Sequence, residues 1–140
     1  MKQRTREIKN IGTVLTNEIE LSDTCLGLYI PIETESANIK AEREKFESWV
    51  VRDAKKLNPE VDFDKCTLNT ETDLHINTGY RQEDGRYTLD FSVGFVSWFE
   101  DTEGNEKYWD ISDNFEIELS EEDRNYIKKV MAHKIVDALI

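Results

Sequence analysis

The two histidines and their acidic neighbours are the first residues to consider for catalysis or metal binding. Asp73 and His75 would share one face of a strand, with Asp110 two strands away. A metal ion needs ligands that converge at about 2.0–2.2 Å, whereas strands two apart are separated by roughly 9–10 Å. His133 and Asp137 are four apart on a predicted helix, which is typical of a surface pair. We therefore predict neither a metal site nor an acid–base site at these histidines.

The two cysteines are the next candidates, as nucleophiles. Cys25 lies in an apolar, strand-like stretch, and Cys66 lies in a short acidic loop with Asp62 and Asp64, so neither cysteine is in a setting that activates a thiol. The acidic segment 58–69 lacks the central glycine and the terminal glutamate of a calcium loop. The six glycines are scattered and form no phosphate-binding loop. The sequence thus predicts no catalytic residue, no cofactor and no metal, and an enzyme or a small-molecule-binding domain is the less favoured alternative.

Helical periodicity predicts two elements around the centre of the chain. One helix runs from about Ser36 to Asn58, where Pro59 ends it. The other begins at Ser120, which forms a near capping box with Asp123, and runs to the C-terminus. Each helix has an apolar stripe that we expect to be buried: Ile39, Phe46, Val50, Ala54 and Leu57 in the first, and Ile127, Met131, Ile135 and Ala138 in the second.

Between the helices, alternating residues predict an antiparallel meander. Odd positions from Tyr87 to Phe99 are apolar or aromatic except for Ser97, and even positions from 72 to 80 form the matching inner face of the preceding strand. A two-residue turn at Asp84-Gly85 would place Ile76 opposite Val93. A three-residue turn at 102–104 then adds a third strand. It predicts these pairs: Phe95 with Ile111, Phe91 with Phe115, Leu89 with Ile117, Asp90 with Glu116, Trp98 with Tyr108, and Glu100 with Glu106.

The N-terminal third has a weaker pattern. Residues 18–21 and 26–32 are interpreted as a hairpin through residues 22–24, although Ile8, Ile11, Leu15 and Ile19 also fit a helix. The predicted fold is a single α+β domain over residues 1–140. It has an antiparallel sheet of three to five strands, in the order β-β-α-β-β-β-α, with two helices packed on one face.

Charge is unevenly distributed along the chain. The net charge is −12, and the segment from Glu60 to Asp123 has 19 acidic against 4 basic residues, a balance of −15. Such acidity disfavours direct nucleic-acid binding. No apolar run approaches the ~20 residues needed to cross a membrane, and no signal-peptide pattern follows the basic start. We therefore expect a cytoplasmic protein with no membrane partner.

The acidic outer face of the meander is the predicted interaction surface. Its candidate partner-binding residues combine carboxylates with two aromatic anchors: Asp90, Trp98, Tyr108, Asp110, Glu116 and Glu118. The favoured interpretation is a small non-enzymatic protein-binding module that presents this face to a basic protein. The alternatives are an inhibitor or immunity-type mimic of nucleic acid, and a self-assembling, homo-oligomeric structural protein of the phage type. A solvated face with no partner is the simplest alternative.

Overall fold

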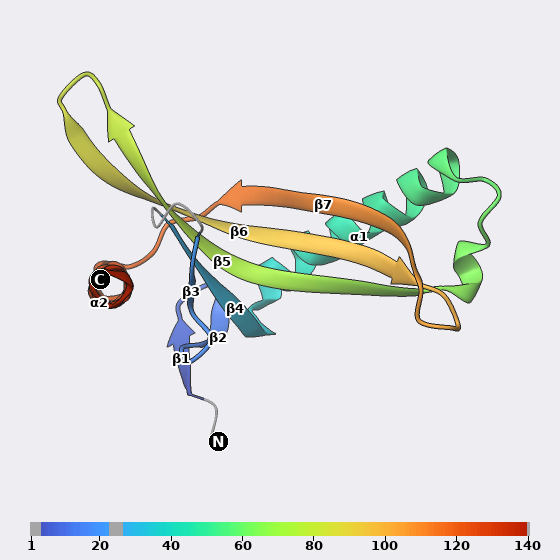
Figure 1. Ribbon diagram of the computed structural model, residues 1–140, viewed down its shortest axis with the longest axis horizontal. Coiled ribbons are helices and arrows are strands. Elements are labelled where there is room, and N and C mark those ends of the chain that lie inside the picture. The colour runs from blue at the N-terminus through green and yellow to red at the C-terminus, as the bar shows by residue number, and fades with distance from the viewer. Residues whose placement is uncertain (1–3, 23–26, 140) are drawn as a thin grey trace.

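The computed structural model describes residues 4–22 and 27–139, and the side chains of residues 80, 87, 107–113 and 138 lie outside this description. The fold is α+β, as predicted, with a seven-stranded antiparallel sheet and two helices (Figure 1). The elements are β1 (Thr5–Ile8), β2 (Gly12–Leu15), β3 (Glu20–Leu21), β4 (Gly27–Glu35), α1 (Ala37–Leu57), the short 3-10 helix η1 (Phe63–Lys65), β5 (Thr67–Arg81), β6 (Arg86–Glu100), β7 (Glu106–Glu116) and α2 (Glu121–Ala138). The predicted order of strands was wrong because it omitted two N-terminal strands.

Both helices begin and end where the sequence indicates. The Ser36 hydroxyl accepts a hydrogen bond from the Ile39 N–H, and α1 ends at Asn58. The Ser120 hydroxyl accepts from the Asp123 N–H at 3.2 Å, which fixes the start of α2. The predicted stripe of α1 is buried except for Leu57, which is exposed. In α2, Ile127 and Met131 are buried and Ile135 is half-buried, whereas the side chain of Ala138 lies outside the described residues.

The β5–β6 hairpin has the predicted faces with a different register. Its connection is a four-residue loop, residues 82–85, in which Gly85 has a positive φ of 67° and its N–H bonds to the Arg81 carbonyl. Ile76 therefore pairs with Phe91 rather than with Val93. A shift of two residues preserves side-chain parity, so both inner faces remain in the core.

The β6–β7 hairpin departs further from prediction. The turn at 102–104 is confirmed, with Gly104 at φ 83° and Glu100 paired with Glu106. Two irregularities in β6–β7 then displace the register by one residue each. Trp98 consequently pairs with Trp109 rather than with Tyr108. The other predicted pairs along this hairpin are also wrong: Glu116 pairs with Ser92 rather than Asp90, Phe115 with Val93, and Phe95 with Asp113.

The N-terminal third forms two hairpins. β1 and β2 are joined by residues 9–11, where Asn10 has a positive φ of 69°. A Cβ atom at Gly12 would lie only 1.9 Å from the Thr34 carbonyl oxygen, so β2 approaches β4 as closely as glycine permits. The predicted pairing of residues 18–21 with 26–32 is confirmed where β3 meets β4, and the turn at 23–26 lies outside the described residues.

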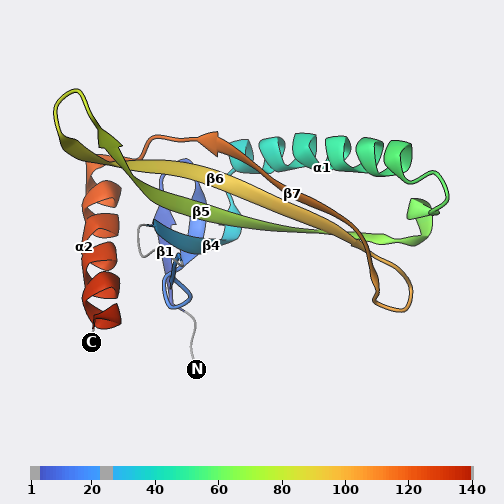
Figure 2. The ribbon, with the colours of Figure 1, turned by 45° about the horizontal axis from the view of Figure 1, so that its top comes forward.

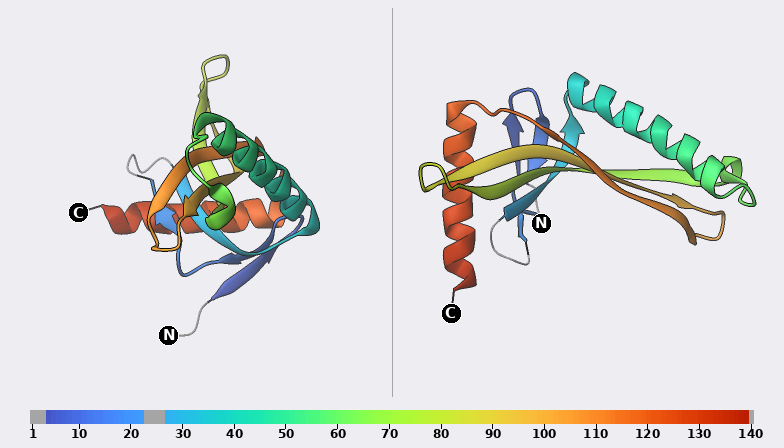
Figure 3. Two further views of the ribbon diagram at one scale, coloured as in Figure 1. Left: turned by 90° about the vertical axis from the view of Figure 1, so that its right-hand side faces the viewer. Right: turned by 90° about the horizontal axis from the view of Figure 1, so that it is seen from above.

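The two helices pack against different parts of one hydrophobic core. Phe46 of α1 stacks on Phe95 of β6, with ring centroids 5.6 Å apart. α2 lies crosswise at the other end of the long strands (Figures 2 and 3), where Ile127 and Met131 are buried. This arrangement leaves the outer face of the sheet uncovered by either helix.

Candidate functional site

The sheet divides where β4 leaves β5. β4 pairs with β5 only from Gly27↔Asn77 to Pro31↔Asp73, and its remaining residues pair with β2 on the opposite edge. On the other side of Asp73, residues 67–72 of β5 pair with β6 and not with β4. β4 and β5 therefore diverge there (Figure 1). We call the space between residues 32–35 and residues 68–72 the wedge. Its volume is about 420 Å³.

A second depression lies on the outer face beside the wedge. This outer hollow has a volume of about 290 Å³ and is formed by β3, β4, β5 and the residues before β3. Its lining combines four carboxylates with two ring side chains: Glu18, Glu20, Glu71 and Asp73, with Tyr29 and Pro31. Among the described residues, the lining includes no lysine or arginine. Glu71 lines both the outer hollow and the wedge, which therefore lie next to each other.

The carboxylates of the outer hollow lie close enough together to perturb one another. Burial raises the pKa of Asp73, and the negative charges of Glu71 and Glu20 add to the shift. None of the four carboxylates has an ion pair within the described residues, whereas Asp64 pairs with Lys55 and Asp84 with Arg81. Crowded, uncompensated negative charge is the main electrostatic property of this hollow.

Tyr29 and His75 give the sheet an aromatic pair next to these carboxylates. Their rings meet edge to face at 4.8 Å, and Tyr29 is 38 % exposed. Burial lowers the pKa of His75, so its imidazole is neutral near pH 7 and adds no cation to the hollow. The ring lies over Gly94, where a Cβ atom would approach the imidazole Cε1 to 2.7 Å. An exposed tyrosine beside carboxylates suits a guanidinium or ammonium group.

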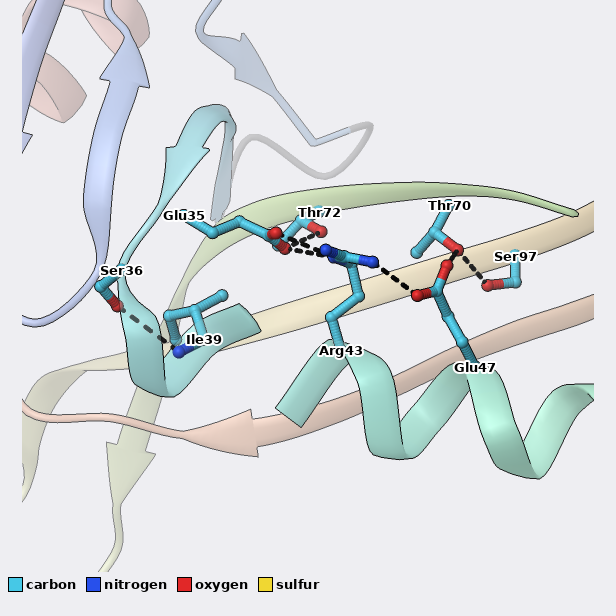
Figure 4. A network of polar contacts seen from close by, with 8 residues as sticks. All are labelled: Glu35, Ser36, Ile39, Arg43, Glu47, Thr70, Thr72 and Ser97. Atoms are coloured by element: carbon cyan, nitrogen blue, oxygen red, sulfur yellow. Dashed lines mark hydrogen bonds and ion pairs between the residues drawn. The ribbon is translucent and has the colours of Figure 1, made fainter. Parts of the chain in front are cut away.

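The wedge has a polar network on its inner side, between α1 and the sheet (Figure 4). The Arg43 Nε donates to both carboxylate oxygens of Glu35 at 2.8 Å, and its Nη1 donates to Glu47. Thr70 donates to Glu47 at 2.6 Å and also contacts the buried Ser97 hydroxyl at 2.7 Å. Burial opposes the charge of Arg43, but these carboxylates outweigh that effect and raise the pKa of Arg43.

The charges lining the wedge remain unbalanced after this pairing. The described lining has four carboxylates, from Glu33, Glu35, Glu47 and Glu71, against one basic residue, Arg43. The wedge and the outer hollow together thus form an acidic region with six different glutamates and Asp73. This region can bind a cationic group by charge and by hydrogen bonding.

Known protein families, curated proteins and solved structures provide no match to this chain. The chemistry of the acidic region must therefore be inferred from its own side chains.

Three of the predicted partner-binding residues lie together in another depression. Asp90, Glu116 and Glu118 line a hollow of about 330 Å³ between β6 and the segment that leads into α2. Arg124 of α2 lies in the same lining, with its guanidinium 5.9 Å from the Phe91 ring centre. One basic group therefore shares this hollow with the three carboxylates, which makes it less negative than the outer hollow.

The other predicted residues lie toward the opposite end of the long strands. Trp98 is half-buried, and its indole N–H donates to Glu100 at 3.1 Å. The backbone of Tyr108 pairs with Phe99 and that of Asp110 with Ser97, and the side chains of both lie outside the described residues. Eight residues of strand, roughly 26 Å, separate Trp98 from Asp90. The six predicted residues therefore divide between two separate surfaces.

Metal-binding or nucleophilic arrangements are not assembled by the described part of the chain. No group of three or more histidine, cysteine, aspartate or glutamate residues there is placed to hold a metal ion. The Cys66 thiol donates to the Asp62 carbonyl, and the Asp62 carboxylate lies 3.9 Å from Lys65. Among the described helices, none combines the length and the apolar composition that a membrane crossing requires.

Sequence reasoning missed most of the acidic region. Four of its glutamates precede the acidic segment that begins at Glu60: Glu18, Glu20, Glu33 and Glu35. They lie near Glu71 because β3 and β5 are both neighbours of β4 in the sheet. The available signal was parity, since Glu18 and Glu20 are two residues apart, as are Glu33 and Glu35. Each pair would be expected to share a face of an extended segment.

Proposed function

We propose that this protein is a non-enzymatic binding module whose acidic outer face binds a basic protein partner. The observation that carries this proposal is the outer hollow, where four carboxylates surround Tyr29 and none has an ion pair within the described residues. Like charges held close together destabilise a fold, so a cationic partner would relieve a cost that the free protein bears. The raised pKa of Asp73 is consistent with that cost.

The hollow also has the composition of a site for basic side chains. Carboxylates bind the guanidinium of arginine through two parallel hydrogen bonds, and an exposed tyrosine ring offers a cation–π contact. Glu20, Glu71 and Asp73 supply the first interaction and Tyr29 the second. The hollow between β6 and α2 is a secondary candidate. Its carboxylates, Asp90, Glu116 and Glu118, are partly neutralised by Arg124 in the same lining.

Capture from a native lysate at 50 mM and 500 mM NaCl tests the proposal. We expect a basic protein to be retained at the lower salt concentration and released at the higher one, because screening weakens interactions between exposed charges. The retained protein is then titrated against the pure chain by calorimetry. Glu20→Gln, Glu71→Gln and Asp73→Asn combined should weaken binding at least tenfold.

A matched variant separates the hollow from overall acidity. Glu44→Gln, Glu83→Gln and Glu103→Gln remove the same charge from exposed positions away from the hollow. This control should lose much less affinity than the hollow variant. Equal losses would show that net charge alone governs binding, and the absence of salt-sensitive capture would overturn the proposed function.

A further inference from the structure

We infer that the basic partner binds as an extended segment that adds a strand to the free edge of β5 in the wedge. This inference rests on the proposed function and names its mode of recognition. The edge in question is residues 67–72, which pair with residues 95–100 of β6 but lie beyond the end of the β4 ladder at Asp73. Six residues of strand span about 20 Å, enough for a partner segment of similar length.

The register determines which backbone groups face the wedge. The Phe91 carbonyl accepts from the Ile117 N–H, so odd residues of β6 direct their backbone groups away from β5. The backbone N–H and C=O groups of even β6 residues therefore point toward β5. Because the β5–β6 ladder pairs even with odd positions, the odd residues of β5 bond to β6 and the backbone groups of its even residues point away from β6. The N–H and C=O groups of Leu68 and Thr70 consequently point into the wedge.

The hydrogen bonds of β4 independently indicate the same direction for the even backbone groups of β5. The Gly27 carbonyl accepts from the Ser22 N–H, so odd residues of β4 face β3 and even residues face β5. In the β4–β5 ladder even residues pair with even residues, which again directs the even backbone groups of β5 toward β4. In residues 67–72 the even backbone groups keep this direction, although β4 is no longer there to pair with them. The edge of β5 that faces the wedge is therefore unpaired by β4.

Two of the other described edges of the sheet, those of β7 and β1, have features that discourage strand addition. β7 has two register irregularities against β6, and such irregularities twist an edge away from regular pairing. β1 has only four residues. Residues 67–72 pair with β6 without interruption and contain no proline or lysine. This segment is therefore a regular edge without those protective features.

Charge selects the occupant. Four glutamates line the wedge, and Arg43 is the one basic residue among its described lining residues, so a lysine- or arginine-containing segment is favoured. A second copy of this chain has a net charge of −12 and would bring further carboxylates to the same place. Backbone pairing would provide affinity, and alternate basic side chains would reach Glu71 and the outer hollow on one side of the added strand.

The test uses the full ¹⁵N-labelled chain and a blocked eight-residue peptide of alternating lysine and valine. We expect the amide signals of Leu68 and Thr70 to shift and their hydrogen exchange to slow by at least tenfold. An analogue with every amide nitrogen methylated keeps the charges but lacks donors, and it should bind at least tenfold more weakly. A peptide of alternating glutamate and valine should not bind.

Two variants and light scattering complete the experiment. Glu33→Gln with Glu71→Gln should weaken binding of the lysine peptide, whereas Glu103→Gln in the β6–β7 turn should not. The inference is overturned if the methylated peptide binds equally well, if the shifts map to another edge, or if light scattering shows that the chain pairs with itself through this edge. Salt-sensitive capture of a basic protein together with any of these results would leave the proposed function standing, because only the strand-addition mode would have failed.

Discussion

Replacement of Arg43 by methionine tests whether the polar network is a stabilising contact between α1 and the sheet. Two N–H groups of Arg43 make charge-assisted hydrogen bonds, because the Nε–H is shared between both carboxylate oxygens of Glu35 and Nη1 donates to Glu47. A hydrogen bond to a charged group contributes about 1.5–3 kcal/mol when buried. The side chains here are 17–24 % exposed, so water recovers part of that energy. We expect a net loss of about 2 kcal/mol in unfolding free energy, or roughly 6 °C in Tm.

The assay is urea unfolding followed by tryptophan fluorescence, with two comparison variants. Arg52→Met removes an exposed ion pair to Asp53 and should cost less than about 0.5 kcal/mol. Combining Arg43→Met with Glu35→Gln and Glu47→Gln removes the stranded carboxylates and should restore at least half of the loss. Equal costs for Arg43→Met and Arg52→Met would refute the reasoning. A combined variant no more stable than Arg43→Met would assign the loss to packing instead of charge.

Two further substitutions test the outer hollow and the core. The pKa of Asp73 is raised above its ordinary 3.8, so its protonation stabilises the fold at low pH and this contribution is lost as pH rises through the folded pKa. Asp73→Asn should therefore unfold at higher urea than the wild type at pH 7, with the difference vanishing below about pH 4. An unchanged difference across this range would contradict the charge argument. Phe95→Ala should cost about 3–5 kcal/mol in the same assay, because Phe95 is 1 % exposed and stacks on Phe46. A cost below about 1 kcal/mol would contradict its central position in the core.

Local signals in the sequence were sufficient for the helices and for the faces of the long strands. Ser36 and Ser120 define helix starts through their own hydrogen bonds, which depend on nearby residues only. Side-chain parity also survived an error in the β5–β6 turn, since the loop is two residues longer than predicted. Ile76 is buried on the predicted face although its partner is Phe91.

Features that depend on distant parts of the chain could not be predicted in the same way. The irregularities in β6–β7 that moved Tyr108 opposite Phe99 leave no periodic pattern. The β1–β2 turn has Asn10 in a left-handed conformation, so the spacing of Ile8 and Ile11, which suits a helix, instead spans a turn. The acidic region was missed because strands far apart in sequence bring Glu20 and Glu71 together.

The contact between β1 and α2 has a consequence for the order of folding. Arg6 of β1 bonds to Asp123 at 3.2 Å and lies 4.2 Å from the centre of the Tyr126 ring, so an early strand depends on the last helix. The bonded residues are 117 positions apart, which corresponds to roughly 6–23 s of synthesis at about 5–20 residues per second. Throughout that interval Arg6 lacks its aspartate, and the N-terminal hairpin pairs with β4 through β2. We therefore expect the docking of α2, which joins the two ends of the described chain, to be a late step of folding.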